Sequence, residues 1–128
     1  MFEKLEIVRM AQAMAAHAGA RQAEISRNIA NADTPGYRAQ DLRPFGTVYE
    51  GGADGMRATR TGHLGQTQQD ASEAADRVLS GTATPNGNSV SLEAEMVKSV
   101  EARQNHDMAL AIYRATSDVI RASLGRSR

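Results

Sequence analysis

The sequence predicts a mainly α-helical chain, in which long N- and C-terminal helices pair as an antiparallel coiled-coil-like hairpin, with a loop-rich middle containing short β segments. Residues 2–32 contain no proline and keep apolar residues at helical spacing. Residues 91–124 show the same spacing. Between them the chain has no sustained period and carries repeated proline and glycine. We therefore expect three parts, at residues 1–33, 34–90 and 91–128.

The N-terminal helix is expected to be about 45 Å long. Its apolar seam has steps of three and four residues, as in a coiled coil: Leu5, Val8, Ala11, Ala15, Ala18, Gln22, Ile25, Ile29 and Ala32. Its predicted helix-packing residues are Leu5, Val8, Ile25 and Ile29. An amphipathic helix packed within one chain is one interpretation. The length and the alanine-rich middle favour packing against copies of the chain or sister proteins.

The helix is expected to end near Ala32. Thr34 precedes proline, which disfavours helical backbone, and Pro35 has no amide hydrogen to continue the helix. Pro35 and Gly36 fit the central positions of a type II turn, with Gly36 at positive φ. Short polar side chains are expected to satisfy backbone groups at this helix end: Asn28, Asn31, Asp33 and Thr34. Tyr37, with an apolar face and a polar tip, is expected to contact a neighbouring subunit.

The middle of the chain is expected to be irregular. Val48-Tyr49 and residues 56–61 are predicted short strands, with a glycine-rich turn at residues 51–55 between them. Residues 66–81 are polar and fit either a loose helix or a disordered segment. Because so long a loop is unusual in a compact domain, we expect this segment to order on assembly.

The C-terminal helix is expected to run from Ser91, a suitable N-cap, to about Leu124, before Gly125. One seam follows Met96, Val100, Gln104, Met108, Ala111, Ala115, Val119 and Ala122. Its predicted helix-packing residues are Met96, Val100, Met108 and Val119.

Composition excludes several classes of protein. In 128 residues, 15 lysines and arginines balance 15 aspartates and glutamates, and no basic stripe indicates a nucleic-acid partner. No apolar run approaches the roughly 20 residues that span a bilayer. The charged N-terminus lacks the apolar core of a secretory signal, so we expect a cytoplasmic protein or one exported without cleavage. The chain has no cysteine, which rules out disulfides and thiolate metal sites.

Nothing in the sequence predicts catalytic, cofactor-binding or metal-binding residues. The three histidines His17, His63 and His106 are scattered without metal-ligand spacing. Glu93 and Glu95 are interpreted as acids favoured by the helix dipole, not as an acid–base pair. We therefore expect no enzyme and no cofactor.

Two stretches resemble signatures of one family. Asn28–Tyr37, which reads Asn-Ile-Ala-Asn-Ala-Asp-Thr-Pro-Gly-Tyr, resembles the N-terminal signature of the flagellar axial proteins, the rod and hook family. Pro85–Met96 resembles the family's glycine–asparagine loop entering the C-terminal helix, with Ser91 where relatives commonly have aspartate. The family motif and turn residues are Asn28, Asn31, Thr34, Pro35, Gly36 and Tyr37. The resemblance implies that the terminal helices pair in an inner domain around a central channel.

The resemblance also implies a function. The chain has no large insertion, which is the pattern of a short proximal rod protein, and residues 1–6 and 17–22 resemble one such protein more than its sister. It implies a structural subunit of the bacterial flagellum basal body, which self-assembles through its terminal helices into the rod that transmits torque for motility and continues the type III export channel. The implied partners are the chain itself, other rod proteins, the hook–basal body adaptor protein, and the membrane ring and export gate at the rod base. The implied location is the periplasmic rod, reached without a cleavable signal peptide. The sister rod protein and a soluble helical adaptor or export chaperone are the alternatives.

Overall fold

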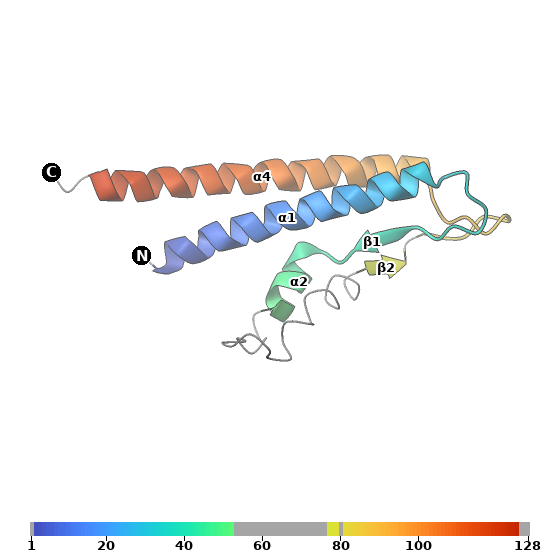
Figure 1. Cartoon of the computed structure of the whole chain (residues 1–128), viewed down its shortest axis with the longest axis horizontal. Coiled ribbons are helices and arrows are strands. Elements are labelled where there is room, and N and C mark those ends of the chain that lie inside the picture. Colours follow the sequence, from blue (N-terminus) through green and yellow to red (C-terminus); the bar gives the residue numbers. More distant parts are fainter. Residues whose placement is uncertain (1, 53–76, 80, 126–128) are drawn as a thin grey trace, which may run out of the picture. The chain divides into compact units, whose positions relative to one another are not determined.

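The computed structural model describes residues 2–52, 77–79 and 81–125. The elements follow in the order α1, β1, α2, β2 and α4 (Figure 1). The described chain is mainly helical, with long terminal helices and a middle that contains short strands, which confirms the predicted fold class. The chain divides into two compact units, one of residues 1–23 with 93–128 and one of residues 24–92.

Helix α1 spans Phe2–Ala30 and helix α4 spans Leu92–Gly125. The predicted boundaries, residues 2–32 and 91–124, differ from these by at most two residues. At the end of α1 the backbone tightens, because the amides of Asn31 and Ala32 bond to carbonyls three residues earlier. Glu93 and Glu95 lie in the first turn of α4, where the helix dipole favours acids.

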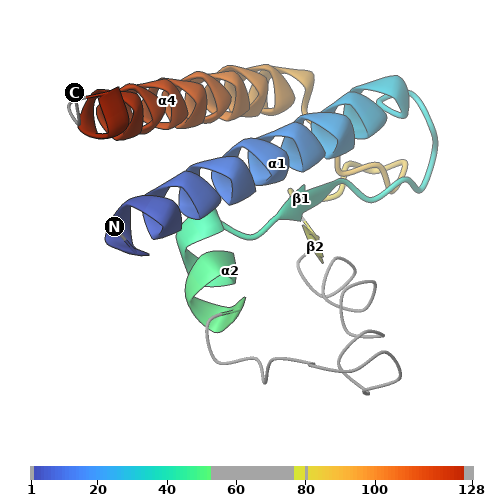
Figure 2. The same cartoon turned by 60° about the vertical axis from the view of Figure 1, so that its left-hand side comes forward.

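In the first unit the two long helices lie side by side and run in opposite directions (Figure 1 and Figure 2). Small residues form the buried face of each helix at seven-residue spacing, Ala11 and Ala18 on α1 and Ala102 and Ala109 on α4. The Gln22 side-chain amide donates to the Ser99 hydroxyl at 3.0 Å, which fixes the register of the pair. Alanine layers allow close approach but bury little apolar area, so the pair gains little hydrophobic stabilisation.

The second unit contains a two-stranded antiparallel sheet. Strand β1 spans Gln40–Leu42 and strand β2 spans Arg77–Leu79, with Asp41 opposite Val78 at the centre of the register. Both strands lie in the part of the chain for which short β segments were predicted, although neither stands at the predicted positions.

The strand predicted at Val48-Tyr49 is wrong, because both residues lie in helix α2, Phe45–Gly52. Two contacts explain the helix. The amides of Thr47 and Val48 bond to the carbonyl of Pro44, which starts the first turn. The rings of Phe45 and Tyr49, four residues apart, stand 5.3 Å apart between centroids, a pairing that helical spacing brings about. The predicted strand at residues 56–61 lies outside the described residues, as do most of the predicted turn at 51–55 and of the polar segment 66–81.

Candidate functional site

The motif residues gather in the second unit, where the end of α1 meets the segment that leads into α4. Asn28 lies in the last turns of α1 and is fully buried. Its side chain binds both the carbonyl and the amide of the Gln40 backbone. Its amide nitrogen donates to the Gln40 carbonyl at 2.7 Å, and its oxygen accepts from the Gln40 amide at 3.1 Å. These two bonds imitate a neighbouring strand, so Asn28 closes one edge of β1.

The turn predicted at Thr34–Tyr37 is present. The Tyr37 amide donates to the Thr34 carbonyl at 3.3 Å, and Gly36 has a φ of 73°. A proline followed by a glycine at positive φ makes this a type II turn, as predicted. The Tyr37 hydroxyl donates to Asn28 at 3.3 Å, which ties the end of the turn back to the helix. Tyr37 is half-buried within the chain, and its contact with a neighbouring subunit stays a prediction.

Asn88, far along the sequence, binds the turn that follows the last residue of α1, Ala30. Its side chain is 3% exposed, and its amide nitrogen lies 3.0, 2.7 and 2.9 Å from the carbonyl oxygens of Asn31, Ala32 and Thr34. Its oxygen accepts from the Val90 amide at 2.8 Å. The sequence analysis missed this residue and assigned the capping to Asn28, Asn31, Asp33 and Thr34.

Of that predicted set, Asn31 does donate to a helix carbonyl, that of Arg27 at 2.8 Å. The Thr34 hydroxyl donates to Asn31 at 3.3 Å. Asn28 faces Gln40 instead of the helix end. The signal that would have found Asn88 is its place in the second signature, beside a glycine loop directly before a helix.

The backbones of the two signatures also pair directly. The Gly36 amide donates to the Asn86 carbonyl at 3.1 Å, and the Ser89 amide donates to the Tyr37 carbonyl at 3.0 Å. The Ser89 hydroxyl accepts from the Ala39 amide at 2.8 Å. Residues 28–40 and 84–90, which we call the signature junction, therefore form one hydrogen-bonded body although about 50 residues separate them.

The predicted helix-packing residues fall into two groups. Ile25 is fully buried and Val8 is half-buried. The other six are 38–67% exposed: Leu5, Ile29, Met96, Val100, Met108 and Val119. The α4 seam read from the sequence is therefore not the face that pairs with α1, since the buried residues of α4 are Glu95, Ala102 and Ala109. Packing of the exposed group against other subunits stays a prediction.

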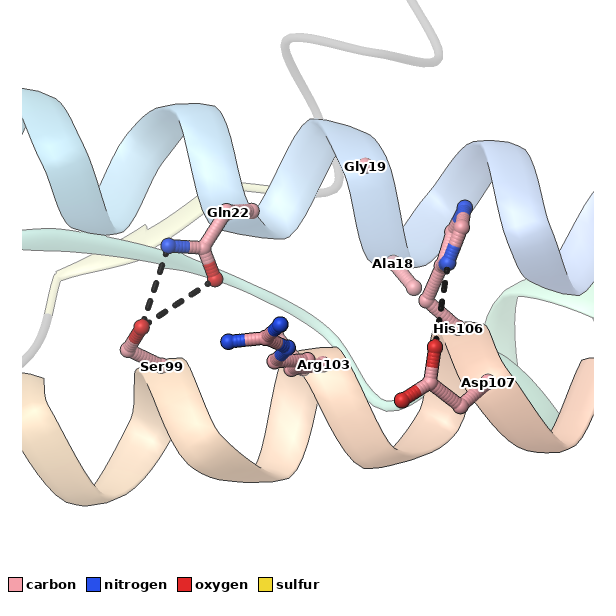
Figure 3. Close-up of a pocket in the computed structure, with 8 residues that line it drawn as sticks. Ala18, Gly19, Gln22, Ser99, Arg103, His106 and Asp107 are labelled. Carbon is pink, nitrogen blue, oxygen red and sulfur yellow. Dashed lines mark hydrogen bonds and ion pairs between the residues drawn. The ribbon is translucent and has the colours of Figure 1, made fainter.

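A shallow groove of about 540 Å³ runs between α1 and α4 in the first unit. Figure 3 shows Gln22 and Ser99 bonded at one end of the groove and His106 beside Asp107 at the other. His106 Nδ1 and Asp107 Oδ1 stand 3.8 Å apart, and both side chains are exposed, so they do not form a buried catalytic dyad. Alanine and glycine, at Ala18, Gly19 and Ala102, line the remainder together with Arg103.

Two buried carboxylates have basic partners on their own helices. Glu24 accepts two bonds from Arg27 at 2.9 and 3.0 Å. Glu95, 2% exposed, accepts from Lys98 at 2.9 Å. Both pairs span three residues of one helix, so they stabilise α1 and α4 locally.

Two comparisons with known proteins found sequence similarity to this chain. The sequence profile of the family described as flagella basal body rod protein matches residues 11–38, which include the Asn28–Tyr37 signature. The flagellar basal body rod protein FlgB of Agrobacterium fabrum is 29% identical over 118 residues, covering 88% of each chain. The chain is thus similar to the flagella basal body rod proteins in its N-terminal signature, and to one rod protein along most of its length.

The signature junction is a site of structural hydrogen bonds. Within residues 2–52, 77–79 and 81–125, no group of three or more histidine, aspartate and glutamate side chains is placed to hold a metal ion. In the same described ranges, no helix combines the length and apolarity required to cross a membrane. The chemistry of the junction consists of amide, hydroxyl and backbone hydrogen bonds, which fix geometry.

Proposed function

We propose that this chain is a proximal rod subunit, which stacks through its terminal helices with copies of itself and other rod proteins. The resulting hollow rod transmits torque and continues the export channel. The similarity to the rod protein family supports the coarser part of the proposal, a structural component of the rod. The finer one is supported by how α4 distributes its side chains.

The observation that carries the proposal is the distribution of apolar side chains on α4, where small residues are buried and larger ones are exposed. Its buried residues are Glu95, Ala102 and Ala109, whereas several of its larger apolar side chains are exposed. Met96, Val97 and Val100 are 60–67% exposed, and Met108 and Val119 about half exposed. Burying one such side chain contributes about 1.5–3 kcal/mol. Neighbouring helices in a tube would supply the burial that the pair within one chain lacks.

The proposed partners follow from the resemblance. They are other rod proteins, the hook–basal body adaptor FliE, and the membrane ring and export gate at the base of the rod. We place the chain in the periplasmic rod after passage through the type III apparatus without cleavage. Edman sequencing or mass spectrometry of rod-derived protein is expected to find residues near Met1. A mature protein that starts well downstream would contradict uncleaved export.

Similarity to FlgB of Agrobacterium fabrum favours the FlgB position in the rod over that of its sister FlgC. In strains that lack either protein, this chain is expected to restore basal bodies only where FlgB is missing. Restoration of the FlgC-deficient strain alone would reverse the assignment.

The decisive experiment charges the outer face of α4. Val119→Asp is expected to be made and secreted normally but to abolish completed basal bodies, because assembly would bury an unpaired carboxylate. Val119→Thr, which keeps the shape without the charge, is the matched control and is expected to retain most basal bodies. Ile25→Asp does not test the interface, since Ile25 is buried within the chain. Normal rods in Val119→Asp would remove this face from assembly, and a soluble one-to-one complex with an exported client would support the adaptor alternative.

A further inference from the structure

Beyond the C-terminal end of an α-helix, the carbonyl groups of the chain have no partners in the helix and need donors from elsewhere. After α1 ends at Ala30, the carbonyls of Asn31, Ala32 and Thr34 converge on one point, the amide nitrogen of Asn88. That donor belongs to a segment 54 to 57 residues later in the sequence. No glycine at positive φ follows directly after Ala30; the first is Gly36.

We propose that Asn88 is the positioning residue that determines in which direction the chain leaves α1. Its side chain, supplied by the far end of the middle segment, holds the carbonyls of the turn that follows the helix. This turn therefore reaches its final geometry only when residues 84–90 have docked. This inference concerns the fold of the single chain, so it stands or fails separately from the rod position proposed above.

The requirement at position 88 is a primary amide. Its two N–H groups serve three carbonyl oxygens, so at least one bond is shared, and its oxygen is occupied by the Val90 amide. Aspartate has nearly the same shape but no donor when ionised, and its charge would face three carbonyl dipoles. Alanine would remove the donor without adding a charge. Comparing Asn88→Asp with Asn88→Ala thus separates the loss of the hydrogen-bond donor from the loss of the whole side-chain amide.

Asn86, two residues earlier, provides a matched control. Its side chain is exposed and acts only as an acceptor, from the Thr84 hydroxyl and from the Asn88 amide at 3.4 Å. Asn86→Asp preserves this acceptor, so the same chemical change in the same loop leaves both of these hydrogen bonds intact.

The test measures amide hydrogen exchange in the full chain. Asn88→Asp and Asn88→Ala are expected to lower protection about tenfold or more at Thr34, Gly36 and Ser89, whose amides bond within the signature junction. Protection around Ala102 and Ala109, in the other unit, is the internal standard that the variant has folded. Asn86→Asp is expected to match the wild type at all these positions.

Acidification supplies the second readout. An unperturbed aspartate has a pKa of about 3.9, and burial beside three carbonyl oxygens raises the pKa of an aspartate at position 88. Below that pKa the neutral acid can donate one hydrogen bond, so Asn88→Asp is expected to regain part of its protection at acidic pH and lose it as the pH rises. Comparison with the wild type over the same pH range removes the effects that both proteins share. Asn88→Ala has no such group and is expected to show no recovery.

Three results would overturn the proposal. The first is wild-type protection at Thr34, Gly36 and Ser89 in both Asn88 variants at neutral pH. The second is equal loss in Asn86→Asp, which would assign the effect to the loop and not to the amide donor. The third is identical pH profiles for Asn88→Asp and Asn88→Ala, which would show that a donor at this position is not what matters.

Discussion

A β-carbon added to Gly87 would stand 3.2 Å from the α-carbon of Gly36. The two signatures therefore approach each other through paired glycines, each at positive φ, at 73° for Gly36 and 81° for Gly87. These positions differ in one respect: a β-carbon on Gly36 itself would meet nothing within 4 Å. Backbone strain acts at both glycines, and crowding acts only at Gly87.

Alanine substitutions are expected to separate these two effects. Gly36→Ala should lower the free energy of unfolding by about 1 kcal/mol, from the positive φ alone. Gly87→Ala should cost more, because its β-carbon also presses on Gly36. Gly46→Ala is the control, since Gly46 lies in α2 with open space and no positive φ, and should be neutral or stabilising. Chemical denaturation of the three variants measures the differences, and equal costs at positions 36 and 87 would contradict the crowding.

A larger residue at Gly36 tests the role of the turn in assembly. Gly36→Val places a β-branched side chain at positive φ and should cost more than alanine. Asp33→Asn, in the same exposed turn, should be tolerated. We expect Gly36→Val to be secreted but to yield few completed basal bodies, counted by electron microscopy. Equal yields for the two variants would remove the turn from assembly, and loss of secreted Gly36→Val would place its role in export.

The bonds of Asn28 to Gln40 should contribute more stability than the bond of Asn28 to Tyr37. Asn28→Ala leaves both the amide and the carbonyl of Gln40 without these partners and opens a small cavity, and should cost about 2–3 kcal/mol. Tyr37→Phe removes one hydroxyl bond of 3.3 Å and should cost about 0.5–1.5 kcal/mol. Urea unfolding monitored by circular dichroism compares the two, and a larger cost for Tyr37→Phe would contradict the assignment.

Two isoleucines of α1 offer a matched pair for core packing. Ile25 is fully buried, whereas Ile29, one turn later, is 38% exposed. Ile25→Ala should cost about 2–5 kcal/mol in the isolated chain, and Ile29→Ala clearly less. Thermal unfolding of both variants measures the difference. Similar losses of stability in the two variants would show that the buried positions at seven-residue spacing, Ala11, Ala18 and Ile25, do not define the core face of α1.

The sequence alone determined the long helices, their boundaries within two residues, and the type II turn. These features depend on local rules, because helical spacing, the restriction before Pro35 and the conformational freedom of Gly36 act on neighbouring residues. Four residues of the first signature, Asn28, Asn31, Thr34 and Tyr37, take part in hydrogen bonds of the signature junction.

The tertiary structure decided the rest. Val48 and Tyr49 have strand-forming side chains, but contacts with Pro44 and Phe45 place them in a helix. The face of α4 that meets α1 was missed because hydrophobicity ranks valine and methionine above alanine, whereas close helix packing selects small residues. The role of Asn88 was missed because its carbonyl partners lie more than 50 residues away. Chain topology decides which residues meet across the fold, and local sequence patterns do not contain it.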